Sequence, residues 1–207
     1  MGPLSIVWLI SVTGFAIAAC ATPGPNNAMV ASSGATFGMI RTLPHIFGIA
    51  IGYSAMLSVV ALVGGEAISA HPSLHEGLRW VAAAYLLWLA IKIARAQPKA
   101  GSGVASQRSR PLTFLQAALF QWVNPKGWAM AISGAATYAA GNGPETTLSV
   151  LIMAGIFLVI GIGTSGLWAG IGAGVATFFR TDAQLRLFNL TMAALLAASI
   201  AGLWFEG

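Results

Sequence analysis

Amide and lysine side chains gather at two short stretches of an otherwise apolar chain, and both stretches contain proline. Residues 21–30 read ATPGPNNAMV, and residues 120–128 read FQWVNPKGW. Asn and Gln amides offer hydrogen-bond donors and acceptors, and a lysine adds a cation. Such groups are suited to holding a small charged solute, and no catalytic residue is assigned. The candidate substrate-binding residues are Thr22, Pro23, Gly24, Pro25, Asn26, Asn27, Gln121, Asn124, Pro125 and Lys126.

Lys126 is the one ionisable residue that falls at the middle of a long apolar segment. A charge buried in hydrocarbon is costly, so such a residue is a functional candidate by default. Two roles stay open for it: pairing with a substrate carboxylate, or bonding the exposed backbone carbonyls of the other proline stretch. For proton coupling the candidates are Lys126, His45 and Glu66. His45 is equally well explained as an interfacial residue without a special role.

The composition indicates a polytopic membrane protein. Of 207 residues, 57% are hydrophobic and only 7% are charged, and the mean hydropathy is +0.80. In a soluble domain about a quarter of all residues are charged. The net charge of +5 comes from dispersed basic residues, which fits membrane topology better than a nucleic-acid partner. Cys20 is the single cysteine, so neither an intrachain disulfide nor a CxxC redox pair is expected.

Six apolar segments are expected to cross the lipid bilayer as helices. Their approximate bounds are 4–40, 44–64, 78–94, 112–140, 146–179 and 187–205. Short basic loops stay on the cytoplasmic side, so the basic stretch 95–111 is placed inside. Eight of the ten Lys and Arg residues then lie inside or next to it, and both termini lie outside.

The first and fourth segments are expected to be broken helices. Pro and Gly interrupt each of them near its middle, and both residues disfavour a helix interior. A continuous helix of about 35 residues would also reach about 50 Å, whereas the hydrocarbon layer is about 30 Å thick. A single helix kinked at proline remains the alternative.

Corresponding positions in the two halves indicate an inverted repeat. Pro25 and Pro125 are 100 residues apart, and so are the Ser-Gly pairs at 33–34 and 133–134. Halves with three spans each must sit upside down to one another. The expected fold is therefore all-α: one transmembrane domain over 1–207, with repeats at about 1–95 and 112–207 joined by a cytoplasmic linker at about 95–111.

Unwound backbone in lipid must face protein or a cavity, so both breaks should meet inside the bundle. Half-helices that start near Asn26 and Gly127 would point free N–H groups at that cavity. Half-helices that end near Thr22 and Val123 would offer free carbonyls. Donors for a carboxylate and acceptors for an ammonium group then converge, and this arrangement favours an amino acid as the solute.

At these two motifs the chain resembles the LysE/RhtB family of bacterial amino-acid exporters. The matching stretches are TPGPNN at 22–27, FGMIRTLPHIFGIAIG at 37–52, GLRWVAAAYLLWLAIKI at 77–93 and RPLTFLQAALFQWVNPKGW at 110–128. The resemblance covers essentially the whole chain. It implies export of amino acids or their derivatives across the inner membrane, driven by the proton-motive force, and is nearest to the cysteine and O-acetylserine exporters. Coupling by the substrate gradient alone stays open.

Three other kinds of function fit the sequence less well. A structural or channel subunit would not explain two facing breaks. A membrane enzyme or thiol-redox carrier would need paired cysteines or clustered acids within the membrane, so an enzyme is not expected. A metal-ion exporter would need oxygen ligands at mid-depth, and His71, His75 and Glu76 are better explained as a solvated loop. Neither a metal nor a cofactor is expected. A homo-oligomer stays open as a partner.

Glycines spaced four residues apart predict close helix contacts in two segments. Gly166, Gly170 and Gly174 form one such row, and Gly48 and Gly52 form a shorter one. Small residues at this spacing let helix backbones approach closely. We expect both rows to pack within the chain, and contact with another subunit stays the alternative.

Overall fold

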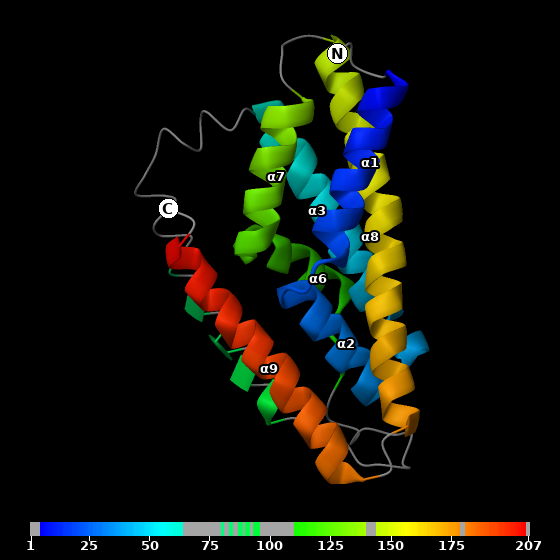
Figure 1. Cartoon of the computed structure of the whole chain (residues 1–207), viewed down its shortest axis with the longest axis vertical. Helices are drawn as coiled ribbons and strands as arrows, with labels where there is room; N and C mark the ends of the chain where they lie inside the picture. Colours follow the sequence, from blue (N-terminus) through cyan, green and yellow to red (C-terminus); the bar gives the residue numbers. More distant parts are fainter. Residues whose placement is uncertain are drawn as a thin grey trace.

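The computed structural model of the chain is a helical bundle (Figure 1). It describes residues 5–63, 80, 83–84, 87–88, 90–91, 93–95, 110–139, 144–178 and 181–205. Within these ranges the ordered elements are helices, without a strand. The elements are α1 (Ile6–Ala21), α2 (Pro25–Phe37), α3 (Met39–Val63), α6 (Phe114–Phe120), the short 3₁₀ helix η1 (Gln121–Val123), α7 (Pro125–Tyr138), α8 (Pro144–Phe178) and α9 (Asp182–Phe205).

The first apolar segment is broken where the sequence places Pro and Gly. Helix α1 ends at Ala21 and α2 begins at Pro25, with an angle of 57° between the two helices. Gly24 has extended backbone with φ of −172°, and Pro25 occupies the first turn of α2, where its missing N–H removes no hydrogen bond. The expected break in the first segment is therefore present.

The fourth segment is broken in the same manner. A capping box between Thr113 and Gln116 starts α6, and the chain tightens into η1 after Phe120. Asn124 then leaves the helical region with ψ of 108°, and Pro125 opens α7. From the middle of the bundle α2 runs downward and α7 runs upward in Figure 1, so the two half-helices point in opposite directions.

Two continuous helices in the described part of the chain are long and apolar enough to span a membrane. They comprise Met39–Leu62 and Pro144–Val175, and the bent pair α1–α2 would make a third span. Only parts of the expected third segment fall within the described residues. The stretch 64–79, which contains Glu66, lies outside them. The six-span inverted repeat therefore stays a prediction.

Large apolar side chains cover the outside of the bundle. Ile10 is 67% exposed, Val159 70% and Leu167 63%. Exposing such an apolar surface to water would be unfavourable, whereas lipid tails solvate it without cost. This surface, together with the apolar spans, is that of a membrane protein.

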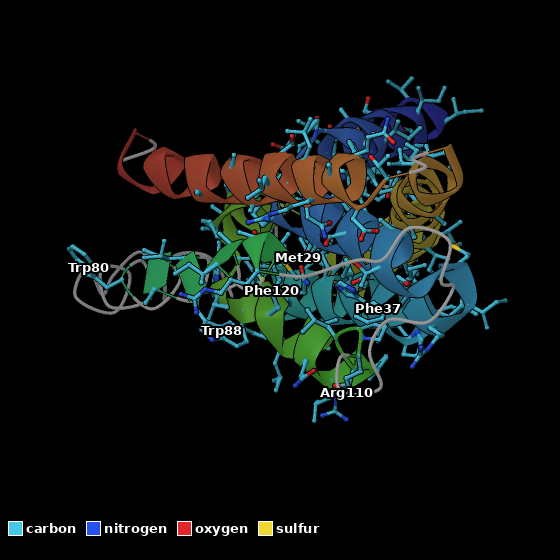
Figure 2. The ribbon with its side chains drawn as sticks, turned by 90° about the horizontal axis from the view of Figure 1, so that it is seen from below. Met29, Phe37, Trp80, Trp88, Arg110 and Phe120 are labelled. Atoms are coloured by element: carbon cyan, nitrogen blue, oxygen red, sulfur yellow. The ribbon has the colours of Figure 1, made fainter. Side chains whose placement is uncertain are left out.

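Helix α2 is buried between α8, α3 and α9. Met29 on α2 joins one buried cluster with Phe120 at the end of α6, and the two are labelled in the view from below (Figure 2). The Ser32 hydroxyl of α2 donates to the Asn189 side-chain oxygen of α9 at 3.2 Å. The half-helix that follows the first break is thus held from several sides.

Close helix contacts depend on glycines, and one expected row is wrong. A Cβ on Gly48 would lie 2.4 Å from the Phe114 carbonyl oxygen, so the row in α3 does pack closely against α6. In α8, by contrast, a Cβ on Gly170 would meet nothing within 4 Å, whereas one on Gly172 would lie 1.9 Å from the Ala31 oxygen. The face of α8 that contacts α2 is therefore rotated away from the Gly166–Gly170–Gly174 row.

Candidate substrate site between the two helix breaks

The carbonyl groups at the end of α1 are satisfied by a side chain from the start of α2. The Asn27 amide nitrogen donates to the Cys20 oxygen at 3.0 Å and to the Thr22 oxygen at 2.9 Å. The Thr22 hydroxyl turns back to the Ala18 oxygen. Asn27 is buried, and it therefore stabilises the break by bonding backbone groups that a helix end leaves unpaired.

A reciprocal amide pair joins the two breaks. The Asn26 amide nitrogen donates to the Gln121 side-chain oxygen at 2.9 Å, and the Gln121 amide nitrogen donates back at 3.1 Å. Gln121 also donates to the Ala117 oxygen and is fully buried. These two amides lie 95 residues apart in sequence, so this pair fixes the first break against the second.

Lys126 reaches from the second break across to the first. Its Nζ donates to the Thr22 carbonyl oxygen at 2.5 Å. A Cβ on Gly24 would lie only 2.8 Å from Lys126 Cδ, so the side chain lies directly against the unwound backbone. The sequence leaves two roles open for Lys126, and in this structure Lys126 bonds an exposed backbone carbonyl.

Both half-helices begin without a side-chain cap. Neither Gly24 before α2 nor Asn124 before α7 makes a capping bond, and each helix has proline in its first turn. The backbone bonds of these helices begin with Ala28 N–H to Gly24 and Trp128 N–H to Asn124. The positive ends of two helix dipoles therefore lie at the breaks, where they favour an anion.

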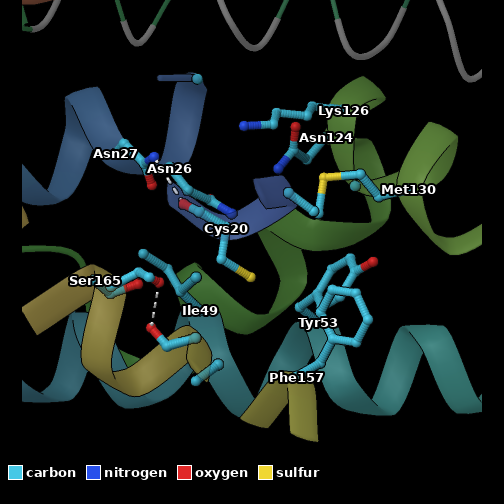
Figure 3. Close-up of a pocket in the computed structure, with 16 residues that line it drawn as sticks. Cys20, Asn26, Asn27, Ile49, Tyr53, Asn124, Lys126, Met130, Phe157 and Ser165 are labelled. Carbon is cyan, nitrogen blue, oxygen red and sulfur yellow. Dashed lines mark hydrogen bonds between the residues drawn. The ribbon is translucent and has the colours of Figure 1, made fainter. Parts of the chain in front are cut away.

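A pocket of about 50 Å³ lies between the breaks and helices α3 and α8 (Figure 3). It is small, so a solute larger than a few water molecules would need side chains to move. Its lining residues are Ala19, Cys20, Gly24, Asn26, Asn27, Ile49, Ala50, Tyr53, Asn124, Lys126, Gly127, Met130, Phe157, Gly161, Thr164 and Ser165.

Two side chains that line this pocket have a buried polar atom without a hydrogen-bond partner among the described residues. They are the Tyr53 hydroxyl and the Asn124 side-chain oxygen. Tyr53 is 6% and Asn124 2% exposed. Buried polar groups are rarely left unpaired because desolvation without a partner is costly. Both atoms are therefore available to a ligand.

His45 lies outside the lining of this pocket. It belongs to α3, is fully buried, and its Nδ1 lies 3.0 Å from the Ser33 hydroxyl of α2. Its Nε2 is buried without a partner. His45 thus sits in the bundle interior beside the half-helix that follows the first break, and its depth in the membrane stays a prediction.

The structure brings most of the expected site residues together. Gly24, Asn26, Asn27, Asn124 and Lys126 line one pocket. Thr22 contributes its carbonyl, the two prolines start the half-helices, and Pro23 lies within the first break. Thr22, the three prolines and Gln121 are not among the lining residues. The Gln121 amide is instead bonded to Asn26 and to the Ala117 carbonyl oxygen.

The sequence analysis missed the pocket wall formed by α3, α7 and α8. Tyr53 and Phe157 stand there with ring centroids 5.3 Å apart, and Met130 lies above them in Figure 3. One signal was available: Tyr53 falls in the middle of an apolar segment, whereas membrane tyrosines gather at the interfaces.

Comparison with known proteins gives one family. The family model described as LysE type translocator matches residues 16–202. A cysteine/O-acetylserine efflux protein of Escherichia coli O157:H7 is 30% identical over 178 residues, covering 84% of this chain and 86% of the relative. The cysteine/O-acetylserine efflux protein of Salmonella paratyphi A is 32% identical over 178 residues, which again cover 84% of this chain and 86% of the relative. No solved structure matches.

Proposed function

Because the chain belongs to the LysE type translocator family, whose members are transporters rather than enzymes, we propose that it exports a small amino acid or amino-acid derivative across the bacterial inner membrane. Transport is secondary, by proton antiport, and the solute is held between the two broken helices. The observation that carries this proposal is the meeting of two uncapped helix starts and one lysine at a single buried pocket.

The substrate carboxylate is placed at the two helix starts. The N–H groups of Asn26 and Asn27 begin α2, and those of Lys126 and Gly127 begin α7, each ahead of the first backbone bond of its helix. Four such donors with two positive dipole ends resemble the anion sites that broken helices form in other transporters. A carboxylate fits the geometry and the charge of this site.

The substrate ammonium group is placed at the acceptors nearby. Asn124 supplies a buried side-chain oxygen without a partner, and α1 ends with the Thr22 carbonyl, which Lys126 occupies in this structure. The Lys126 ammonium group thus stands where a substrate ammonium group would bind. When the substrate arrives it displaces Lys126, which then turns to pair with the carboxylate. This exchange keeps the Thr22 carbonyl hydrogen-bonded to an ammonium group in both states.

The two halves give the carrier its alternating access. Half-helices α2 and α7 begin alike, with proline in the first turn, and run in opposite directions. We place them in two inverted repeats of three spans each, with both termini outside. Rocking of one repeat against the other opens the site alternately to either side.

For proton coupling, Lys126 and His45 are the candidates within the described residues. His45 faces Ser33 on α2, and neither α2 nor α6, which flank it, carries a titratable residue. A proton taken up there would have to be solvated by new contacts, which requires α2 and α3 to shift. Glu66, the third candidate, lies outside the described residues.

Uptake into proteoliposomes tests the proposal. Inverted or mixed-orientation vesicles that contain the wild-type protein should accumulate at least one radiolabelled amino acid in response to a pH gradient. Lys126→Ala should lower that rate about tenfold or more, since the cation that pairs with the substrate carboxylate is lost, and Pro25→Ala should also reduce it. Arg186→Ala, at an exposed basic residue of α9, is the matched control.

Two results would defeat the proposal. One is a folded wild-type protein that moves no amino acid from a full panel. The other is a Lys126→Ala variant that transports as fast as Arg186→Ala. The alternative of a metal-ion exporter has no observation in its favour, because a lysine and two positive helix ends repel a divalent cation.

A further inference from the structure

The pocket has two chemically different sides, and the second is not used by the amino and carboxyl groups of a substrate. The break residues form one side. The other is built from α3, α7 and α8, with Ile49, Tyr53, Met130, Phe157 and Gly161 in its lining. This second side also carries three hydroxyl groups, those of Tyr53, Thr164 and Ser165. Thr164 donates to the Ile160 carbonyl oxygen within α8, and of the three only the Tyr53 hydroxyl is a buried polar atom without a hydrogen-bond partner among the described residues. A substrate held by its α-carbon groups at the breaks would direct its own side chain here.

The Tyr53 hydroxyl is buried and has no hydrogen-bond partner in the part of the chain that the structure describes. Its ring is fixed, because it packs against Phe157 at 5.3 Å and belongs to the buried cluster that includes Met56 and Leu57. A phenol can donate and accept one hydrogen bond each. A phenylalanine would fill the same space without leaving a polar group unsatisfied, so the hydroxyl indicates a ligand atom that the structure does not contain.

We propose that Tyr53 is a specificity-determining residue of this carrier, whose hydroxyl hydrogen-bonds an oxygen or sulfur atom of the substrate's side chain. This inference rests on the proposed function. It follows that serine-like and cysteine-like solutes bind better than solutes of equal size that end in a methyl group. A site built around a hydrogen bond discriminates against an analogue that lacks the bonding atom, because its own polar group is then left unpaired.

Charge and space restrict the substrate further. Among the lining residues that the structure describes, Lys126 is the only Lys, Arg, Asp, Glu or His, and two positive helix ends adjoin it. A basic side chain would bring a second cation without a counter-charge. The pocket is only about 50 Å³, and Gly161 lies against Ala50 with a built Cβ at 3.5 Å. Short neutral side chains therefore fit, whereas lysine and arginine do not.

The test compares serine with 2-aminobutyrate, in which a methyl group replaces the hydroxyl. Competition of each solute against a transported amino acid is measured in proteoliposomes of wild type, Tyr53→Phe and Tyr138→Phe. Tyr138 is the matched control because its hydroxyl reaches the Ser11 carbonyl and it does not line the pocket. We expect wild type and Tyr138→Phe to prefer serine by about tenfold or more, and Tyr53→Phe to lose that preference through weaker serine binding.

The outcomes separate this inference from the proposed function. If wild type transports amino acids but Tyr53→Phe keeps the wild-type preference for serine, the role of Tyr53 is overturned. The same conclusion follows if wild type does not distinguish serine from 2-aminobutyrate. If lysine competes with the transported amino acid as well as serine does, the restriction to short neutral side chains is overturned. If wild type transports no amino acid at all, the proposed function itself fails. The measured quantity is the ratio of serine to 2-aminobutyrate competition within one variant. A lower amount of folded carrier in that variant leaves this ratio unchanged.

Discussion

At the scale of single residues, the two breaks are held by side chains that sequence reasoning had assigned to the substrate. Asn27 bonds the carbonyls that end α1, and Asn26 and Gln121 bond each other. The residue types and the stretches were predictable, because Pro and Gly act locally. The partners were not, because which amide meets which carbonyl depends on how segments about a hundred residues apart are brought together.

Asn27 is therefore predicted to be a stability residue as well as a pocket residue. Asn27→Ala should lower the free energy of unfolding by about 1–3 kcal/mol, since two buried carbonyls lose their donor. Thermal unfolding of the purified protein in detergent measures this. Gln116→Ala, which removes an exposed capping bond of α6, should cost less. An equal or smaller loss for Asn27→Ala would show that water replaces its contacts.

At the scale of helices, the position of α2 depends on very close contact with α8. A Cβ on Gly34 would lie 2.1 Å from the Ala169 oxygen, and one on Gly172 would lie 1.9 Å from the Ala31 oxygen. The sequence revealed that α8 is rich in glycine, but not which of its faces meets α2. An apolar helix in lipid lacks the polar stripe that fixes rotation in a soluble protein, and for this reason the expected row was assigned to the wrong face.

A pair of glycines in one helix tests this contact. Gly172→Ala should destabilise the protein by about 1–3 kcal/mol or more, because α2 and α8 must separate to admit the methyl group. Gly170→Ala should be neutral or slightly stabilising, since open space surrounds that position and alanine favours a helix. Thermal stability of both variants in the same detergent gives the answer. Equal stability of the two variants would contradict the described α2–α8 interface.

At the scale of the whole molecule, the sequence predicted the helical class, the membrane setting and the two breaks, and these are confirmed. It missed the wall around Tyr53, because a run of apolar residues does not say which of them face a cavity. It also could not locate His45 in the interior, since a histidine near a segment end is read as interfacial.

The inverted topology predicts the side of the membrane on which each loop lies. With the single Cys20 replaced by serine, a new cysteine at Glu145 should react with a membrane-impermeant thiol reagent added to intact spheroplasts. A cysteine at Arg110 should react only after the membrane is permeabilised. Both positions flank described helices, at the start of α8 and shortly before α6. Labelling of both from the same side would rule out three spans in the second half.

The central claim is that a small amino acid binds where the two unwound stretches meet, and Cys20 reports on that place. Cys20 is the only cysteine of the chain and lines the pocket. The decisive measurement is its rate of alkylation by N-ethylmaleimide in the purified protein, with and without a saturating amino acid that the protein transports. The account predicts that the amino acid slows labelling several-fold in wild type and not in Lys126→Ala. An unchanged rate in wild type, with transport of that same amino acid demonstrated, would place the binding site elsewhere.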